Sequence, residues 1–212
     1  MIKAHRNKRI IVCVLTGIFI ILGPLICIAE NDFVKLRTES AKIKTLQADF
    51  IQKKFMKILS KPLVSEGCFF YAAPTSIRWE YFKPLKSIVI ANKNFTKRYI
   101  YSDGKMVEDE TGGVQAMKIV LSEVADWMSG KFDQNPSFKA AVSKKANTFI
   151  TLTPVGESMA GMIEKIEITL SAKGRVVKSV KIFEGAGSFT QINFDNVKVN
   201  ATINESVFQD VQ

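Results

Sequence analysis

The sequence predicts a mainly β protein of the α+β class, a strongly curved antiparallel sheet or incomplete barrel of about ten to eleven strands whose concave face is covered by helices. Three observations predict this class. Short segments of alternating apolar and polar residues follow one another in hairpin order, with Gly, Pro and Asn in the turns. Only two segments have helical spacing. The sequence shows no strand–helix–strand rhythm and no repeat of roughly 20 to 50 residues.

The first half of the chain combines one helix with a series of strands. Apolar residues at helical spacing predict a helix from Asn31 to about Lys44, with Asn31 or Asp32 as its N-cap. From Leu46 the period changes to two, which predicts a strand. Asp103-Gly104 is typical of a tight hairpin turn. Further strands are expected at residues 63–71, 76–82, 86–91, 95–101 and 106–110.

A second helix is inserted between two groups of strands. Apolar residues from Met117 to Met128 recur at three- and four-residue steps, which predicts one helix that ends near Gly130. Beyond Pro136 the period returns to two. Strands are expected at residues 138–143, 148–154, 163–171, 176–184 and 188–199.

Length and composition fit one folded domain preceded by a targeting segment. The 212 residues are 47% hydrophobic and 24% charged, which argues against disorder. Residues 1–29 have a basic start, an apolar run, a Gly23-Pro24 break and a small-x-small site at Cys27-Ile28-Ala29. We therefore expect residues 1–29 to be a cleaved Sec signal peptide and residues 30–212 to form a single exported domain.

Two alternatives to cleavage stay open. Residues 10–29 form an uncharged stretch of 20 residues, about the minimum that spans a bilayer, so the segment could be kept as an anchor. A lipidated Cys27 is the other alternative, although Ile26 stands where such signals have a small residue.

The charge balance argues against nucleic acid as a partner. After removal of residues 1–29, 26 basic and 20 acidic residues remain, a net charge of +6. Lys and Arg are scattered among acidic residues rather than gathered in one patch. We therefore expect no nucleic-acid binding.

The residue inventory excludes most catalytic chemistry. The only His, His5, and two of the three Cys, Cys13 and Cys27, lie in residues 1–29. The expected mature chain therefore lacks His-based triads, Cys–His pairs, zinc sites built from His and Cys, and internal disulfides. Cys68 lies in an apolar run and is expected to be a buried small hydrophobe.

Chemistry by carboxylates alone is the remaining enzyme option. Its best candidates are Glu108, Asp109 and Glu110, but adjacent acids in a strand or turn do not converge on one point. We expect them to form a solvated turn, and we expect a protein that is not an enzyme and that has no metal and no cofactor.

A set of motifs in one fixed order resembles the periplasmic lipoprotein-carrier family, the LolA type, over nearly the whole expected mature chain. The first motifs are Thr45-Leu46-Gln47-Ala48-Asp49-Phe50-Ile51-Gln52, Glu66-Gly67, Pro74, Ile77-Arg78-Trp79-Glu80-Tyr81 and Pro84. The later ones are Ala125-Asp126-Trp127, the strand from Phe149 to Pro154, Ile192-Asn193-Phe194, Asn200 and Phe208.

The resemblance implies an incomplete antiparallel barrel with an α-helical lid over an apolar cavity that takes acyl chains. It also implies a periplasmic, monomeric chaperone. Its partners would be acylated lipoproteins or lipids, an inner-membrane ABC release complex and an outer-membrane acceptor lipoprotein. The alternative is a divergent lipid-binding or sensing protein for another lipid or lipidated product, free or anchored in the inner membrane.

One position departs from the family pattern. The family has an Arg directly before the proline that precedes the third strand, thought to hold the lid shut by hydrogen bonding, and Ala73 stands there in this chain. Arg78 matches the Arg-Trp pair of the family and not this latch. Either another residue latches the lid, or the chain carries a different lipid.

Aromatic content and alternation select the residues expected to line the cavity; the plain alternative is that they fill an ordinary core. The expected residues on the sheet side are Phe50, Phe70, Trp79, Tyr81, Ile88 and Ile90. Those on the lid helix are Met117, Leu121, Val124 and Trp127.

Overall fold

The computed structural model of the protein describes residues 27–109, 113–144, 146–156, 161–171, 176–209 and 211. Residues 1–26, which make up most of the expected signal peptide, and Glu110 lie outside the described residues. The side chains of residues 27–31 and 113–119 also lie outside them, although both segments belong to helices.

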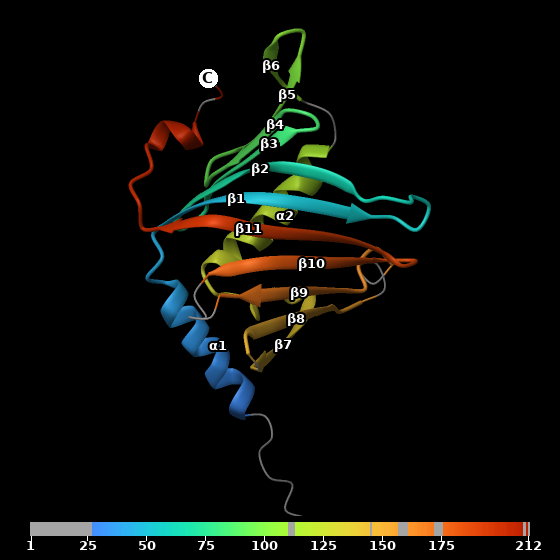
Figure 1. Ribbon diagram of the computed structural model, residues 1–212. Coiled ribbons are helices and arrows are strands. Elements are labelled where there is room, and N and C mark those ends of the chain that lie inside the picture. Colours follow the sequence, from blue (N-terminus) through green and yellow to red (C-terminus); the bar gives the residue numbers. More distant parts are fainter. Residues whose placement is uncertain are drawn as a thin grey trace, which may run out of the picture.

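The described strands form one antiparallel sheet of 11 strands in the order β6-β5-β4-β3-β2-β1-β11-β10-β9-β8-β7. The sheet is curved and does not close, which confirms the predicted incomplete barrel (Figure 1). The strands are β1 (Thr45–Phe55), β2 (Leu63–Ala72), β3 (Ser76–Lys83), β4 (Ser87–Ala91), β5 (Thr96–Ser102), β6 (Lys105–Glu108), β7 (Phe138–Lys144), β8 (Thr148–Pro154), β9 (Lys165–Leu170), β10 (Val177–Gly185) and β11 (Ser188–Val199).

The first helix differs from its prediction at both ends. Helix α1 (Cys27–Ser40) begins four residues before Asn31 and ends four residues before Lys44. Asn31 and Asp32 therefore lie inside the helix, and the expected N-cap is wrong. No helix breaker stands between Cys27 and Asn31, so the local sequence lets the helix continue toward the N-terminus. Neither α1 nor any other described helix has the length and apolar character needed to cross a membrane.

Helix α2 (Gly113–Met128) follows β6 and precedes β7, the two edge strands of the sheet. The chain must therefore cross from one edge to the other, and α2 makes this crossing over the concave face (Figure 1). The predicted end near Gly130 is confirmed, because Gly130 has a φ of +75° and its N–H donates to the Trp127 carbonyl.

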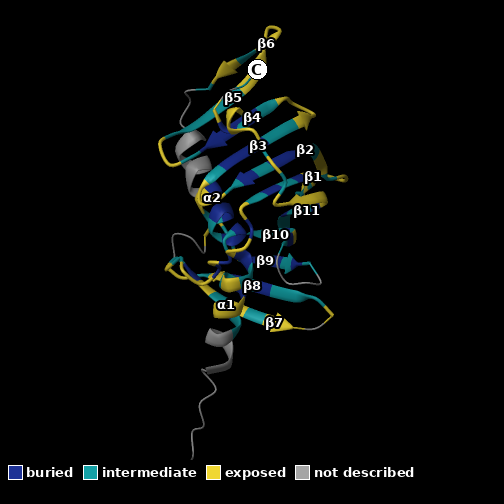
Figure 2. Ribbon diagram, turned by 90° about the vertical axis from the view of Figure 1, so that its left-hand side faces the viewer, coloured by how far each residue is buried: buried dark blue, intermediate teal, exposed yellow. Residues whose placement is uncertain are grey.

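Buried side chains lie where the strands and α2 face each other, and the hairpin tips are exposed (Figure 2). Gly67 shows how closely the core packs. A Cβ atom at Gly67 would lie 1.9 Å from the Glu80 carbonyl oxygen and 2.6 Å from Cζ of Phe50. Only glycine therefore lets the Phe50 ring cover β2 at this point.

The tight turn predicted between the fifth and sixth strands is confirmed. Asp103 and Gly104 have φ values of 49° and 82°, and Ser102 pairs with Lys105 across them. A short 3-10 helix, η1 (Glu205–Phe208), lies on the convex side of the sheet, where Arg78 of β3 donates to the Val207 carbonyl.

Candidate ligand-binding cavity

An apolar cavity of about 160 Å³ lies between the concave face of the sheet and α2. Its walls come from β1, β3, β4, β10 and β11 on one side and from α2 on the other. The lining residues are Gln52, Trp79, Tyr81, Val89, Val120, Leu121, Val124, Trp127, Met128, Val180, Ile182, Glu184, Thr190, Ile192 and Phe194.

An aromatic cluster supports the sheet side of the cavity. The Phe50 ring lies 4.9 Å from Trp79 and 5.2 Å from Tyr81, measured between ring centroids. Phe194 lies 6.1 Å from Trp79. Phe50 is buried and does not itself line the cavity. Its ring packs against Trp79 and Tyr81 on the same face of the sheet and helps to fix their positions.

The lid side is apolar where α2 meets the sheet. Leu121, Val124, Trp127 and Met128 are buried and line the cavity, whereas Val120 lines it but is half exposed. Val120 therefore marks the side of α2 at which the cavity opens to solvent. Apolar contacts of this kind can be replaced by a ligand without breaking hydrogen bonds.

Polar groups gather at one end of the cavity. The Tyr81 hydroxyl donates to Oε1 of Gln52 at 3.0 Å, and Oγ1 of Thr190 donates to Oε1 of Glu184 at 2.6 Å. Nζ of Lys54 lies 2.9 Å from Oε2 of Glu184. These residues stand where β1, β3 and β10 end and β11 begins, and we call this end of the sheet the open end. Burial raises the pKa of Tyr81, so its hydroxyl stays a donor at neutral pH.

One indole group adds hydrogen-bonding capacity inside the apolar walls. Nε1 of Trp127 is buried and finds no acceptor among the described residues, whereas the Trp79 indole interacts with the Tyr81 hydroxyl. An unpaired buried donor costs free energy, so a ligand that brings a carbonyl oxygen into the cavity would gain from the Trp127 indole. The cavity can therefore hold a chain that is mainly apolar and that carries acceptor atoms.

Five of the ten residues expected at the site line the cavity: Trp79, Tyr81, Leu121, Val124 and Trp127. That they contact a ligand stays a prediction. Phe50 does not line the cavity but packs against Trp79 and Tyr81. Met117 belongs to α2, but its side chain lies outside the described residues.

The other three expected residues, Phe70, Ile88 and Ile90, lie on the opposite face of the sheet, so their assignment to the concave side is wrong. Phe70 pairs with Arg78, which pairs with Ile90. Phe69, Trp79 and Val89 form the neighbouring row, and it is this row that faces inward. Both rows are apolar in β2 and β4, so alternation alone does not say which row faces the concave side.

Residues of the last two strands were missed as cavity walls. Val180 and Ile182 of β10 and Ile192 of β11 line the cavity. The signal that could have found them is pairing, because Val180 stands opposite Ile192 in the register of the two strands. Apolar residues on both faces of the predicted strand at 176–184 hid this signal.

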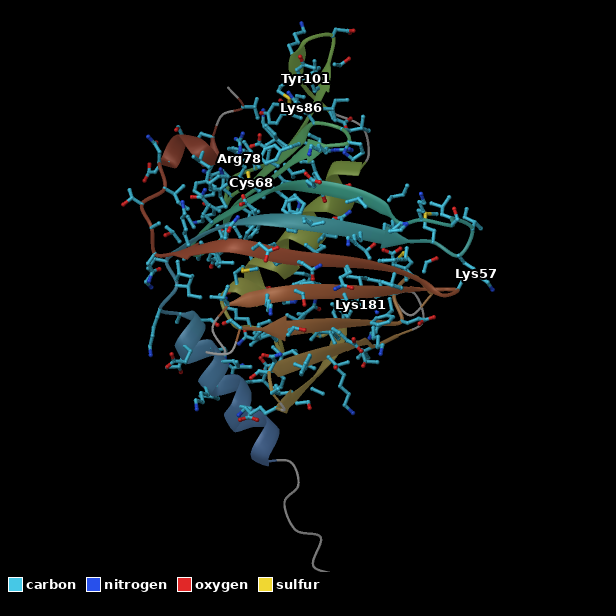
Figure 3. All side chains as sticks on the ribbon, viewed as in Figure 1. Lys57, Cys68, Arg78, Lys86, Tyr101 and Lys181 are labelled. Carbon is cyan, nitrogen blue, oxygen red and sulfur yellow. The ribbon has the colours of Figure 1, made fainter. Side chains whose placement is uncertain are left out.

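Arg78 has a structural role on the convex face. The side chain is buried, its Nε donates to Glu80 at 2.8 Å, and its guanidinium also donates to the Val207 carbonyl. Figure 3 places Arg78 and Cys68 beside the C-terminal 3-10 helix. Arg78 therefore helps to hold η1 on the sheet, away from the lid.

Cys68 is buried as the sequence predicts, but the acidic run does not form the expected solvated turn: Glu108 ends β6, and the Asp109 side chain is only 8% exposed. Cys68 is buried, and this burial raises the pKa of its thiol to about 12, so it is not a nucleophile. Glu108 pairs with Lys97 at 2.9 Å and Asp109 pairs with Arg98 at 2.9 Å. Two separate ion pairs do not make a paired-carboxylate site. The described residues also hold no group of three or more side chains able to bind a metal.

The family model for the outer membrane lipoprotein carrier protein LolA matches residues 41–210. The chain belongs to this family. A LolA-family protein from Pseudoalteromonas translucida, named an outer-membrane lipoprotein carrier protein, is 21% identical over 92% of this chain and 91% of its own length. One of the same name from Dechloromonas aromatica is 26% identical over 84% of this chain and 80% of its own. Proteins of the LolA family are carriers and not enzymes. Membership of this family therefore confirms the expectation that the chain is not an enzyme.

A solved structure supports the fold independently of the sequence. An uncharacterized conserved protein from Thermus thermophilus superimposes with a TM-score of 0.53, covering 86% of this chain and 94% of its own, at 8% identity. The superposition supports the curved sheet with its helices. At so low an identity it gives no information about the ligand.

Proposed function

We propose that the protein is a periplasmic carrier that binds the acyl chains of lipoproteins in the cavity under α2 and moves them from the inner to the outer membrane. The observation that carries the proposal is the apolar cavity between the concave sheet and α2, which is partly open to solvent. Membership of the LolA family, whose named relatives are lipoprotein carriers, supports the same cargo.

The size of the cavity has a consequence for the mechanism. A cavity of about 150 Å³ is large enough for a benzene molecule, and the 160 Å³ found here is close to that volume. An acyl chain of about 15 methylenes is several times longer than such a molecule. Uptake of a whole chain therefore requires α2 to move away from the sheet, so the observed position of α2 corresponds to a closed lid.

The energetics of acyl transfer fit a loose cavity. Each methylene moved out of water contributes about 0.8 kcal/mol, so a chain of about 15 methylenes contributes on the order of 12 kcal/mol before costs. Opening the apolar contact between α2 and the sheet offsets part of this gain. Cargo is then protected from water but can still be released to an acceptor.

Location and partners follow from the same proposal. Residues 1–29 act as the signal peptide, and the cargo comes from an inner-membrane ABC release complex and passes to an outer-membrane acceptor lipoprotein. N-terminal sequencing of the exported protein tests the first point. Glu30 as the first residue supports cleavage, and a chain that begins at Met1 would show a retained anchor.

The acyl-binding role is tested by uptake of a fluorescent fatty acyl probe into protein purified from the periplasm without detergent. Leu121→Glu places a carboxylate in the cavity wall, and we expect it to weaken uptake roughly tenfold or more, because the charge resists desolvation. Ser122→Glu adds the same group to the exposed side of α2 and should leave uptake within about twofold of the parent protein.

Thermal unfolding separates binding from folding in these variants. If the melting temperature of the Leu121→Glu protein collapses while its folded fraction binds the probe normally, Leu121 belongs to the core and not to a binding wall. Native mass spectrometry of the parent protein followed by lipid extraction identifies the cargo, and a protein that carries no acyl mass and takes up no probe would refute the carrier proposal.

A further inference from the structure

The end of β1 and the start of β2 form a hairpin that projects from the sheet at the open end, as the β10–β11 hairpin also does (Figure 1). We call residues 53–64 the tip hairpin. Four of its apolar side chains are exposed: Ile58 (84%), Leu59 (40%), Leu63 (55%) and Val64 (42%). Apolar side chains gathered on a projecting hairpin indicate a surface that is covered in use.

The same segment is strongly basic. Lys53, Lys54, Lys57 and Lys61 lie within residues 53–64, and this segment contains no acidic residue. Lys53, Lys57 and Lys61 are exposed, and Figure 3 shows Lys57 at the outer end of the hairpin. Lys54 forms an ion pair with Glu184 at the cavity rim. The outer part of the tip hairpin therefore combines apolar contact with positive charge.

Aromatic packing fixes the direction of the tip hairpin. The Phe55 ring stacks on Phe189 of β11 with centroids 4.4 Å apart, and Phe183 lies 6.1 Å from Phe189. Nζ of Lys181 lies 4.0 Å from the Phe189 centroid. The hairpin is therefore held at its base by the neighbouring strand and presents its outer residues in one orientation.

The tip hairpin also stands next to the cavity. Gln52 and Thr190 line the cavity, and Lys54, the second residue of the hairpin, pairs with Thr190 in the register of β1 and β11. Ile58 is six residues from Gln52, a span of at most about 20 Å in an extended chain. A surface that binds the outer residues would therefore lie close to the cavity opening.

We propose that the tip hairpin docks the protein on the surface of an anionic phospholipid bilayer. Ile58 and Leu59 enter the region between headgroups and acyl chains, and Lys57 and Lys61 bind headgroup phosphates. Charge complementarity selects this occupant, because Lys53, Lys57 and Lys61 are exposed in a segment that has no acidic residue, and they match a negative surface. The docking itself depends only on the hairpin; its use in delivering an acyl chain rests on the proposed carrier function.

The test measures binding of the purified exported protein to protein-free vesicles by flotation. We expect binding to vesicles that contain phosphatidylglycerol, weaker binding to pure phosphatidylcholine vesicles, and loss of binding as salt rises. The double variant Lys57→Glu/Lys61→Glu should bind at least roughly 25-fold more weakly, since loss of each lysine near an anionic surface costs about fivefold and each new carboxylate is repelled by that surface. Ile58→Ser/Leu59→Ser should bind about tenfold more weakly.

A control variant replaces one exposed apolar residue and one exposed lysine on α1, outside the tip hairpin. Val34 and Lys35 are exposed neighbours on α1, away from the open end, and Val34→Ser/Lys35→Glu should keep the parent affinity for vesicles. Uptake of the acyl probe in solution should be equal in all three variants, which separates failure of docking from failure of the cavity.

Three results would overturn the docking proposal. They are equal loss of vesicle binding in the α1 control, unchanged binding in both hairpin variants, and no binding of the parent protein to protein-free vesicles. In the last case, dependence of cargo exchange on the tip hairpin only when a membrane protein is present would assign the surface to a protein partner. Normal probe uptake in any of these cases would leave the carrier proposal intact.

Discussion

The two ends of the curved sheet are built in different ways. At the open end, polar side chains rim the cavity and the tip hairpin exposes apolar residues to solvent. At the other end, which we call the closed end, β1 begins, β11 ends and α1 packs beside the end of α2. There the Arg37 guanidinium donates to both carboxylate oxygens of Asp133, at 2.6 and 2.8 Å.

The closed end is held by backbone contact and by polar bonds. A Cβ atom at Gly130 would lie 2.9 Å from both Cα of Arg37 and the Leu36 carbonyl oxygen, so the turn after α2 touches the backbone of α1. Asn135 donates a hydrogen bond to Glu123 and ties this turn to α2. By contrast, the described side chains of α2 that line the cavity meet the sheet through apolar contacts. The comparison predicts that α2 opens at the open end while its Gly130 end stays in place.

The largest effect is expected from Gly130→Ala. Its φ of +75° is strained for any L side chain by about 1–2 kcal/mol, and contact with the α1 backbone adds about 1–3 kcal/mol of overpacking. We expect the free energy of unfolding, measured by chemical denaturation, to fall by about 2–5 kcal/mol.

Gly187→Ala is the matched control at the open end. Gly187 has a φ of +76°, but nothing lies within 4 Å of a Cβ atom placed there. Only the backbone strain of about 1–2 kcal/mol is expected. Equal losses in the two variants would show that the contact between the α2 turn and α1 does not hold the closed end together.

A smaller loss is expected from Asn200→Gly, which tests the polar clip at the same end. Oδ1 of Asn200 accepts from the Lys44 N–H at 2.7 Å, and its Nδ2 donates to the Lys42 carbonyl at 3.0 Å. Glycine keeps the φ of +57° accessible while it removes both bonds. The expected loss in free energy of unfolding is about 1–2 kcal/mol.

Asn196→Gly supplies the comparison for the Asn200 variant. Asn196 also has a positive φ, but its side chain makes one bond, to the Asp49 carboxylate at 2.7 Å, rather than bonds to the backbone of a neighbouring segment. We expect a loss below about 1 kcal/mol in the same denaturation experiment. A larger loss than in Asn200→Gly would contradict the special role of the closed end.

The succession of strands along the chain was predictable because each strand and turn carries its own local signal, whereas the pairing of β1 with β11 was not predicted. Alternation located the strands, Asp103-Gly104 located a hairpin, and Gly130 located the end of α2. Strand length was less predictable, since the alternation supports the strand only as far as Lys53, whereas β1 continues through Lys54 to Phe55. Pairing with Phe189 of β11 extends the strand, and this partner is far away in the sequence.

The candidate site was harder to predict than the fold because it depends on which face of each strand points inward. In β3 the inward face was predicted correctly, since Trp79 and Tyr81 alternate with the charged residues Arg78 and Glu80. In β2 and β4 both faces are covered, one by α2 and the other near the C-terminal segment. The sequence around Phe70 and Ile90 therefore does not show which side chains point to the concave side. Only the register to Trp79 assigns the faces, and register is a tertiary property.

The smallest expected effects are those of pH on the free energy of unfolding, and a different side chain causes them at each end of the sheet. Burial raises the pKa of Glu123 near the closed end above its usual 4.5, and burial raises the pKa of Tyr81 at the open end above 10.0. Each acid is therefore easier to ionise in the unfolded chain, so stability is lost as pH rises through these values. Acidification from neutral pH toward 4.5 should recover the Glu123 contribution, and alkaline pH above 10 should remove the Tyr81 contribution.

Glu123→Gln isolates the acidic part of this dependence. Glutamine can still accept the bond from Asn135 but has no charge to desolvate, so the variant should be slightly more stable than the parent at about pH 7 and equal to it near about pH 4. Thermal unfolding of both proteins across this range measures the difference. A variant less stable at neutral pH would mean that the ionised carboxylate strengthens the tie to Asn135 by more than its burial costs, and that the closed end depends on charge.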